Sequence, residues 1–360
     1  MKPEQPKSVG QPPKDQIVSL DINKILRDKP IEVPENSVLI GEIQEKRKNA
    51  LVSLVLHAGV QLDNSIILPL FEILRKNGIT ERLDLFLFTT GGATEVPWRI
   101  VSLLREFCSE YYAIIPHIAL SAGTHIALGA NALVMSEIST LGPVDPTRNH
   151  PLLPKDKNDN PIPVSVEDLK HCIKFISQQI EEKYTPSDMA TIINTLFNHI
   201  EPLAIGAIEQ SYMLSRYITQ KVLETHLNPN EHEEKIKKIV AKIGGEYYSH
   251  SFPITRRDVE KDLGLSVIRP DQELWNSVWN LHLYYQSLLG KEMKLTLGFK
   301  NAQGIEQKED FFIDILGFID IINERRVLVG VKKIVKKGDK LQEIGLFKGW
   351  VVPVSKPLQT

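Results

Sequence analysis

LDLFLFTTGG (residues 83–92) is an apolar run of strand length that ends in two threonines and two glycines. The run does not alternate, which is typical of a parallel strand buried on both faces. Helix-like and strand-like segments then follow in turn: EVPWRIVSLLREF (95–107), YAIIPHI (112–118), SAGTHIALGA (121–130) and ALVM (132–135). This order predicts right-handed crossovers, a parallel sheet and an α/β fold. Ligands of such sheets gather at the C-terminal ends of strands, where TTGG and the segment around Ser121 lie.

The sequence on either side extends this unit. VLIGEIQ (38–44) and ALVSLVLHA (50–58) are apolar runs of strand length, and the segment 62–78 has the pattern of a helix closed by Gly78. A polar loop follows Thr147, and helical patterns continue from there to about residue 290. Helices therefore follow the predicted sheet as additional packing elements.

Changes of composition predict the domain boundaries. The N-terminus, MKPEQPKSVGQPPKDQ (1–16), is too polar and Pro-rich to bury much surface. Beyond Lys294 the runs are rich in β-branched and aromatic residues. We therefore expect a flexible leader over 1–34, a main domain over 35–290 and a small β-rich C-terminal domain over 291–360.

Composition also narrows the partners and the compartment. The chain of 360 residues has 43 Lys and Arg against 45 Asp and Glu, a formal net charge of −2. This balance creates no global field for nucleic acid or an anionic membrane. Two cysteines, Cys108 and Cys172, cannot form a disulfide framework and suit a reducing, cytoplasmic location. The uncharged stretch 111–136 contains Pro116 and Gly123, which favour short buried elements over a membrane helix.

The segment PHIALSAGTHIALGA (116–130) carries the first candidate for chemistry. Ser121 stands where a strand turns into a helix, so its hydroxyl lies near the positive end of the helix dipole. The small residues Ala122 and Gly123 leave room for a substrate backbone. A buried serine that merely caps the helix is the alternative interpretation.

The second candidate is the pair Gly91–Gly92, directly after a buried strand. Glycine lets a backbone N–H approach a ligand without a Cβ in the way. The N–H groups of Gly92 and Ala122 could together form an oxyanion hole, although an ordinary strand-to-helix turn would use the same residues. The sequence has no HExxH, CxxC, phosphate-loop or GxGxxG pattern, so we expect neither a metal nor a cofactor.

Three longer segments resemble the serine dehydrogenase proteinase family: LFTTGGATEVPWRIVSLLREF (87–107), PHIALSAGTHIALGANALVMSEISTLGPVDPT (116–147) and SHSFPITRRDVEKDLGLSV (249–267). This family belongs to the Clp protease/crotonase-like superfamily, with signal peptide peptidase A and the NfeD-type proteases. The resemblance covers roughly residues 35–285. It implies a spiral ββα core and a serine peptidase that needs no cofactor, acts on protein or peptide substrates and forms a homo-oligomer.

The resemblance also implies site residues. The serine before Ala-Gly is the nucleophile of the Clp-type pattern, which assigns that role to Ser121. The glycine pair donates an oxyanion-hole N–H, which assigns that role to Gly92 with Gly91 beside it, and Ala122 supplies the second N–H.

The general base is where this chain departs from the Clp-type pattern, because LGPVDP (141–146) has no histidine. Asp145 lies near that position, and the segment 249–267 contains another candidate base, His250. We expect His250 to approach Ser121 with Asp145 orienting it, a reshuffled Ser–His–Asp arrangement. Membrane-anchored relatives use a Ser–Lys dyad instead; the candidate lysines here are Lys155, Lys157 and Lys170. His125, four residues after Ser121, could touch the serine, but we interpret it as a buried structural histidine.

Two rival functions remain at this point. An acyl-CoA-type crotonase would use a Glu or Asp base on a thioester. A catalytically inactive or latent oligomeric scaffold, which the missing Clp-type histidine favours, would bind partners through the C-terminal domain. In the peptidase interpretation the same domain would recruit the substrate.

Overall fold

The computed structural model describes residues 22–145, 156–157, 186–198, 201–247, 249–300, 306–337 and 340–356. The start of the predicted leader and most of the polar loop after Thr147 lie outside these residues. So do Lys155, Lys170 and Cys172.

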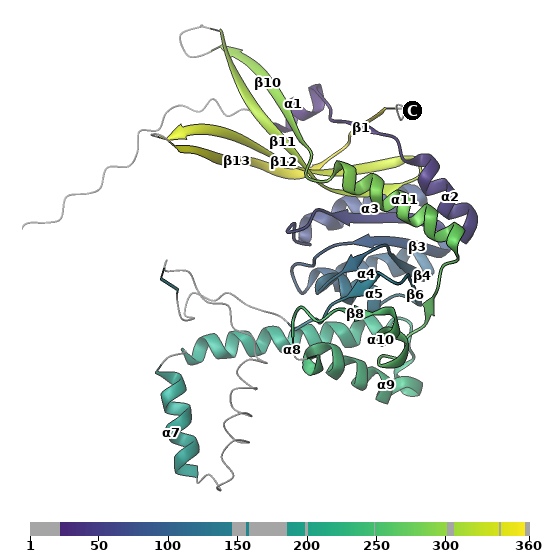
Figure 1. Ribbon diagram of the computed structural model, residues 1–360, viewed down its shortest axis with the longest axis vertical. Coiled ribbons are helices and arrows are strands. Elements are labelled where there is room, and N and C mark those ends of the chain that lie inside the picture. Colours follow the sequence, from purple (N-terminus) through teal and green to yellow (C-terminus); the bar gives the residue numbers. More distant parts are fainter. Residues whose placement is uncertain are drawn as a thin grey trace, which may run out of the picture.

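A nine-stranded sheet forms the centre of the described part of the chain (Figure 1), in the order β13-β12-β11-β2-β3-β4-β6-β9, with β10 paired to β11. Five adjacent strands run parallel to one another: β2 (Ala50–Leu56), β3 (Thr80–Phe88), β4 (Cys108–Ile115), β6 (Ala132–Met135) and β9 (Val267–Ile268). The predicted α/β architecture with a parallel sheet is confirmed.

Helices cover both faces of this sheet, because alternate residues of its strands enter two hydrophobic clusters. Leu54 and Leu56 of β2 pack on one side, where the helices are α3 (Ile67–Asn77), α4 (Val96–Phe107) and α5 (Ala122–Leu128). Leu51 and Val55 pack on the other side, against α2 (Ser37–Arg47) and α11 (Gln272–Leu288).

Helix α2 corrects one prediction, because residues 38–44 were expected to be a strand. Ile40 and Ile43, three residues apart, are the buried positions of this helix. Lys48 ends the helix in a left-handed conformation, with φ 56° and ψ 28°. A short apolar run fits either period, so tertiary packing decides between strand and helix.

A second, three-stranded sheet lies at the C-terminal ends of the parallel strands. It has the order β5-β7-β8, with bounds β5 (Ile118–Ala119), β7 (Thr140–Leu141) and β8 (Ile254–Thr255). An isolated bridge between Thr89 and Ala119 joins it to the end of β3. This arrangement places the TTGG segment beside the start of α5.

A second group of helices lies at the other end of the molecule from the C-terminal strands (Figure 1). They are α7 (Pro186–Phe197), α8 (Pro202–Glu224), α9 (Pro229–Ala241), the π-turn η2 (Lys242–Glu246) and α10 (Arg256–Lys261). Helix α8 packs on α5 and so supports the turn at Ser121 from behind. No helix in the described ranges is long and apolar enough to cross a membrane.

The C-terminal strands continue the central sheet instead of forming a separate one. They are β10 (Glu292–Lys300), β11 (Glu306–Ile321), β12 (Glu324–Lys337) and β13 (Lys340–Val351). Strand β11 pairs antiparallel with β2 from Gly317 to Asp320. A Cβ on Gly317 would lie 2.6 Å from Leu56 Cδ2, so the strands approach closely there. The far ends of β10–β11 and β12–β13 leave the body as two arms (Figure 1).

The N-terminal elements also pack against this C-terminal part. They are α1 (Ile22–Asp28) and β1 (Glu32–Pro34), and β1 pairs in parallel with β14 (Val354–Lys356). Leu26, Ile31 and Val33 are buried. Residues 22–34, which the sequence places in the leader, are therefore part of the folded body.

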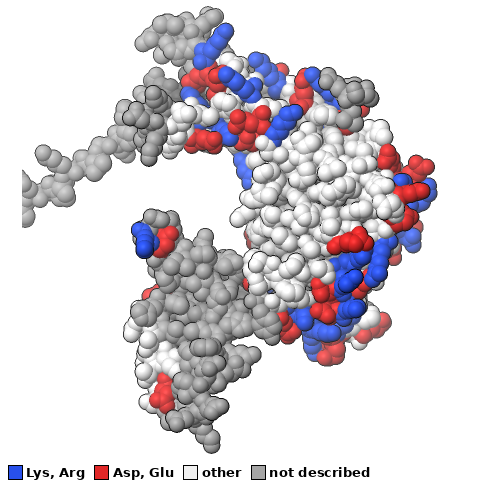
Figure 2. Space-filling view, in the orientation of Figure 1, with Lys and Arg blue, Asp and Glu red and all other residues white. Residues whose placement is uncertain are grey.

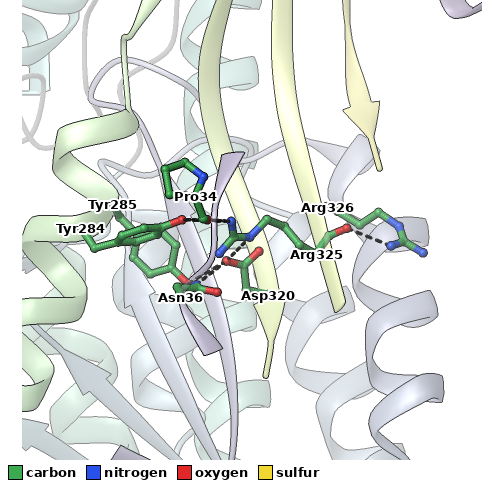
Figure 3. A network of polar contacts seen from close by, with 7 residues as sticks. All are labelled: Pro34, Asn36, Tyr284, Tyr285, Asp320, Arg325 and Arg326. Carbon is green, nitrogen blue, oxygen red and sulfur yellow. Dashed lines mark hydrogen bonds and ion pairs between the residues drawn. The ribbon is translucent and has the colours of Figure 1, made fainter. Parts of the chain in front are cut away.

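A buried ion pair fixes these segments to one another. Arg325 Nε donates to Asp320 Oδ2 over 2.9 Å, and the two side chains are 6% and 0% exposed. Four groups complete the network (Figure 3): the side chains of Asn36, Tyr284 and Tyr285 and the carbonyl of Pro34. Burial raises the pKa of Asp320. Removal of one partner would leave a buried charge uncompensated, so the network ties β1, α2, α11 and β11–β12 into one unit.

Charges of both signs are interspersed on the C-terminal strands (Figure 2). Lys332 Nζ lies 2.9 Å from Glu292 Oε2 and 3.1 Å from Asp314 Oδ2, and Lys333 pairs with Glu309. These ion pairs place carboxylates directly beside two lysines of β12.

Candidate active site

Ser121 occupies a sharp, strained turn between β5 and α5. Its backbone has φ 50° and ψ −114°, whereas Lys48, the other described non-glycine residue with positive φ, lies in the left-handed helical region. Such a conformation costs about 1–3 kcal/mol and persists only where the surroundings enforce it. The Ser121 side chain makes no capping bond to α5. Its hydroxyl is therefore held at the start of the helix without being used by the helix, as at the nucleophile of strand–turn–helix hydrolases.

Glycines on both sides of the turn make this conformation possible. A Cβ on Gly91 would lie 2.8 Å from Ser121 Cβ and 2.9 Å from the carbonyl oxygen of Leu120. A Cβ on Gly123 would lie 2.6 Å from Thr89 Cγ2. The TTGG segment and the serine turn are therefore in direct contact, and a larger residue at either glycine would separate them.

Gly92 is held by Leu62, in the segment between β2 and α3. The N–H of Leu62 donates to the carbonyl of Gly91 over 2.8 Å, and the carbonyl of Leu62 accepts from Ala93 over 2.8 Å. In a parallel bridge of this kind the residue between the two bonds turns its own N–H to the opposite side. The N–H of Gly92 points away from Leu62, and it has no backbone or side-chain acceptor among the described residues. Ala122 is the first residue of α5, so its N–H has no partner within the helix.

Asp145 and His250, far apart in sequence, are in contact. His250 Nδ1 lies 3.0 Å from Asp145 Oδ1; the Asp145 side chain is 11% exposed and that of His250 is 49% exposed. The hydrogen bond to Asp145 raises the pKa of His250, although partial burial opposes the shift. Because Nδ1 is engaged, Nε2 is the ring nitrogen left for another partner.

The structure places most of the predicted site residues around one pocket of about 270 Å³. The pocket is lined by Gly59, Gln61, Thr90, Gly91, Gly92, Thr94, Ser121, Ala122, His125, Val144 and His250. Asp145 reaches it through His250. Among these described lining residues there is no carboxylate.

Two residues that sequence reasoning passed over shape this site. Thr124, fully buried, has its hydroxyl 2.8 Å from the carbonyl oxygens of both Ala119 and Gly142, and it accepts the N–H of Gly142 over 3.1 Å. It thereby joins α5 to the segment that carries Asp145. Leu62 fixes the glycine pair through its backbone, and neither role leaves a motif. The available signal for Thr124 was a hydroxyl in a helix whose other residues, His125 apart, are small or apolar.

His125, whose spacing would let it touch Ser121 but which the sequence led us to interpret as a buried structural histidine, is buried and also lines the pocket. It is 2% exposed, and its Nε2 lies 3.2 Å from the carbonyl oxygen of Ser215 on α8. A carbonyl can only accept, so Nε2 carries the proton. Burial lowers the pKa of His125 to about 4, which keeps the ring neutral. Ser215 in turn donates to the carbonyl of Val144 over 2.5 Å, next to Asp145.

Of the three candidate lysines the structure describes Lys157, and the roles suggested for Lys155 and Lys170 stay predictions. Lys157 is exposed, whereas Lys155 and Lys170 lie outside the described residues. Within the described ranges, no group of three or more His, Cys, Asp or Glu side chains could hold a metal ion.

Comparison with known proteins confirms the resemblance inferred from the sequence. Residues 14–153 match the model of a family described as ClpP-like SDH-type serine proteinases. Among curated proteins, the uncharacterized protein MJ0137 of Methanocaldococcus jannaschii is 26% identical over 244 residues, covering 68% of this chain and 72% of the relative. The uncharacterized protein MJ1495 of the same organism is 26% identical over 159 residues, covering 39% of this chain and 54% of the relative.

Solved structures similar to this chain include two variants of the 1510-N membrane-bound stomatin-specific protease. Both are 15% identical to this chain, with TM-scores of 0.34 and 0.33. The alignment with the first variant covers 68% of this chain and 87% of that protein. The alignment with the second variant, which is in complex with a substrate peptide, covers 63% of this chain and 78% of that protein.

Proposed function

We propose that this chain, whose residues 14–153 match the model of the ClpP-like SDH-type serine proteinases, is a serine-type peptidase with Ser121 as its nucleophile. The observation that carries the proposal is one pocket shared by a strained Ser121, the uncommitted N–H of Gly92 and His250. The substrate class is a protein or peptide, because this family type is proteolytic. We further propose that the protein works in the cytoplasm as a homo-oligomer.

The first chemical step is attack by the Ser121 hydroxyl on a peptide carbonyl. The Oγ–C bond forms while the hydroxyl proton passes to His250 Nε2. Asp145 holds the ring through Nδ1 and stabilises the imidazolium that results. The strained turn at Ser121 presents Oγ to the substrate without any rearrangement of the helix.

The negative charge that develops on the carbonyl oxygen lies between the N–H groups of Gly92 and Ala122. The positive end of α5 adds to this stabilisation. Removal of a single such donor from a serine peptidase costs about 10²–10³ in rate, so this pair accounts for a large share of the catalysis.

The proton then returns to complete the cycle. His250 gives it to the leaving amine as the C–N bond breaks, which leaves an acyl-enzyme on Ser121. Water attacks the acyl carbon while His250 takes its proton. The Oγ–C bond then breaks as His250 returns the proton to Ser121 Oγ, which releases the new carboxyl terminus and restores the free serine.

The test is hydrolysis of an unfolded protein such as casein by the purified chain. We expect release of peptides by the natural protein and none by Ser121→Ala, with both variants equally folded by circular dichroism. Equal hydrolysis by the two proteins would contradict the assignment of Ser121. Turnover of a generic acyl-CoA that Ser121→Ala leaves unchanged would favour the crotonase alternative.

A further inference from the structure

The segment of residues 57–66, between β2 and α3, touches both the pocket and the C-terminal strand β13. Gly59 and Gln61 line the pocket. Leu62 makes the two backbone hydrogen bonds that set the course of the chain through Gly92. Beyond Leu62 the segment turns away and meets β13 at the short helix η1 (Asn64–Ile66).

Two side chains of β13 contact this turn. Lys348 Nζ lies 3.5 Å from Asp63 Oδ2, and Trp350 Nε1 donates to Ser65 Oγ over 3.3 Å. Asp63 also accepts the N–H of Ser65 through Oδ1 over 2.8 Å. The contacts from β13 therefore reach the two residues whose mutual hydrogen bond defines the turn, and Asp63 is the direct neighbour of Leu62.

A displacement of Leu62 would also displace Gly92, because the two backbones are in direct contact. A Cβ on Gly92 would lie 2.3 Å from both the N and the O of Leu62. The direction of the Gly92 N–H is therefore set by the position of the Leu62 peptide groups. A displacement of about 1 Å at a catalytic group can cost 10²-fold in rate, so small movements here are consequential.

We infer that Lys348 and Trp350 are positioning residues for the oxyanion hole, acting through Asp63, Ser65 and Leu62 on the N–H of Gly92. The inference rests on the proposed function of Gly92. The C-terminal strands thus hold the segment that orients one of the two N–H donors of the oxyanion hole.

The turn has a second anchor, which makes the inference testable without unfolding the protein. Arg99 Nη1 on α4 donates to Asn64 Oδ1 over 2.6 Å. Lys348 and Asp63 are about half exposed, at 45% and 44%, so loss of their ion pair has little effect on stability. Trp350→Phe removes the N–H donor and retains an aromatic ring.

The experiment measures how fast a fluorophosphonate probe labels the folded, full-length protein at increasing probe concentrations. Its limiting rate reports stabilisation of the reacting state, and the concentration at half that rate reports binding. For the double variant Lys348→Met/Trp350→Phe we expect the limiting rate to fall about threefold to tenfold while the half-saturating concentration stays unchanged. Each single variant should show a smaller fall, and Lys348→Arg should retain the natural rate.

The matched control is Lys294→Met, which breaks the ion pair of Lys294 and Asp310 between β10 and β11. These side chains are 57% and 43% exposed, similar to the tested pair, and they lie on β10 and β11 instead of β13. An unchanged limiting rate in the double variant, or an equal fall in the control, would overturn the inference and leave the proposed function standing. Absence of labelling in the natural protein, or labelling that survives Ser121→Ala, would overturn both.

Discussion

At the scale of the single residue, the site depends on positions where a side chain is absent. Gly92 lies between the Leu62 peptide and the serine turn, and Gly91 adopts φ 104° beside Ser121. The sequence indicated the glycine pair because two glycines directly follow a buried strand. The sequence could not indicate Leu62, because that residue acts through its backbone N–H and carbonyl. Any other residue with an N–H at this position could make the same hydrogen bonds.

Gly92→Ala is expected to abolish or nearly abolish labelling by a fluorophosphonate. The added Cβ would overlap the backbone of Leu62, so the strand must move and the N–H of Gly92 moves with it. Loss of one oxyanion donor predicts a fall of about 10²–10³ in rate. The control is Gly345→Ala, where a Cβ meets nothing within 4 Å. A Gly92→Ala rate within threefold of the natural one would contradict this role.

The base can be tested through the pH dependence of labelling. His250 must be neutral to accept the serine proton, and its pKa is raised above the ordinary 6.5 by the hydrogen bond to Asp145. The rate should therefore rise with pH through a midpoint above 6.5. Asp145→Asn removes the charge that raises this pKa, so the midpoint should shift to lower pH while the plateau falls by about 10²–10⁴-fold. A profile that Asp145→Asn leaves unchanged would exclude His250 as the base.

At the scale of the element, the strands of the parallel sheet were predictable and their partners at its edge were not. Continuous apolar runs identify β2, β3, β4 and β6 because a strand buried on both faces has few polar residues; Ser53 in β2 and Asp84 in β3 are buried exceptions. The antiparallel pairing of β11 with β2 joins residues more than 250 positions apart, as in Phe318 opposite Val55. No local pattern encodes such a pairing, so the sequence predicted a separate domain for the C-terminal strands.

Removal of residues 291–360 tests that pairing. Recruitment of substrate by a separate C-terminal domain would predict a truncated protein that still reacts with a small probe. The structure predicts the opposite, because deletion exposes the edge of β2, removes buried Phe318 and Ile319 and leaves the partners of Arg325 and Asp320 unsatisfied. We expect an insoluble chain or one without a cooperative thermal transition. A truncated chain that unfolds cooperatively and is labelled at the natural rate would contradict this account.

At the scale of the whole molecule, helix α8 at one end and strand β13 at the other each hold a segment that borders the candidate active site. Helix α8 fixes the segment next to Asp145 through Ser215, whose hydroxyl donates to the carbonyl of Val144. Strand β13 reaches the 57–66 segment through Lys348 and Trp350. The sequence could bring Ser121, Asp145 and His250 together only through resemblance to a family. Their supports come from elements distant in sequence and leave no motif.

The proposed homo-oligomer is also a property of the whole molecule. A broad face of the body shows almost no charged side chains, although charge is plentiful around its margin (Figure 2). A surface without charge can meet its own copy without like-charge repulsion, and interface cores are depleted in charge. We expect light scattering at micromolar concentration to give a mass that is a multiple of 40.7 kDa. A monomer mass that persists as the concentration is raised would rule out a stable assembly.

The most direct test of the central claim is to locate the residue that a fluorophosphonate modifies. The natural protein would be labelled near neutral pH, digested with trypsin and analysed by mass spectrometry, with Ser121→Ala and heat-denatured protein treated in parallel. The account predicts a single phosphonylated residue, Ser121, and no adduct in either control. An adduct on another residue, or no adduct on a folded protein that hydrolyses casein, would show that the nucleophile lies elsewhere.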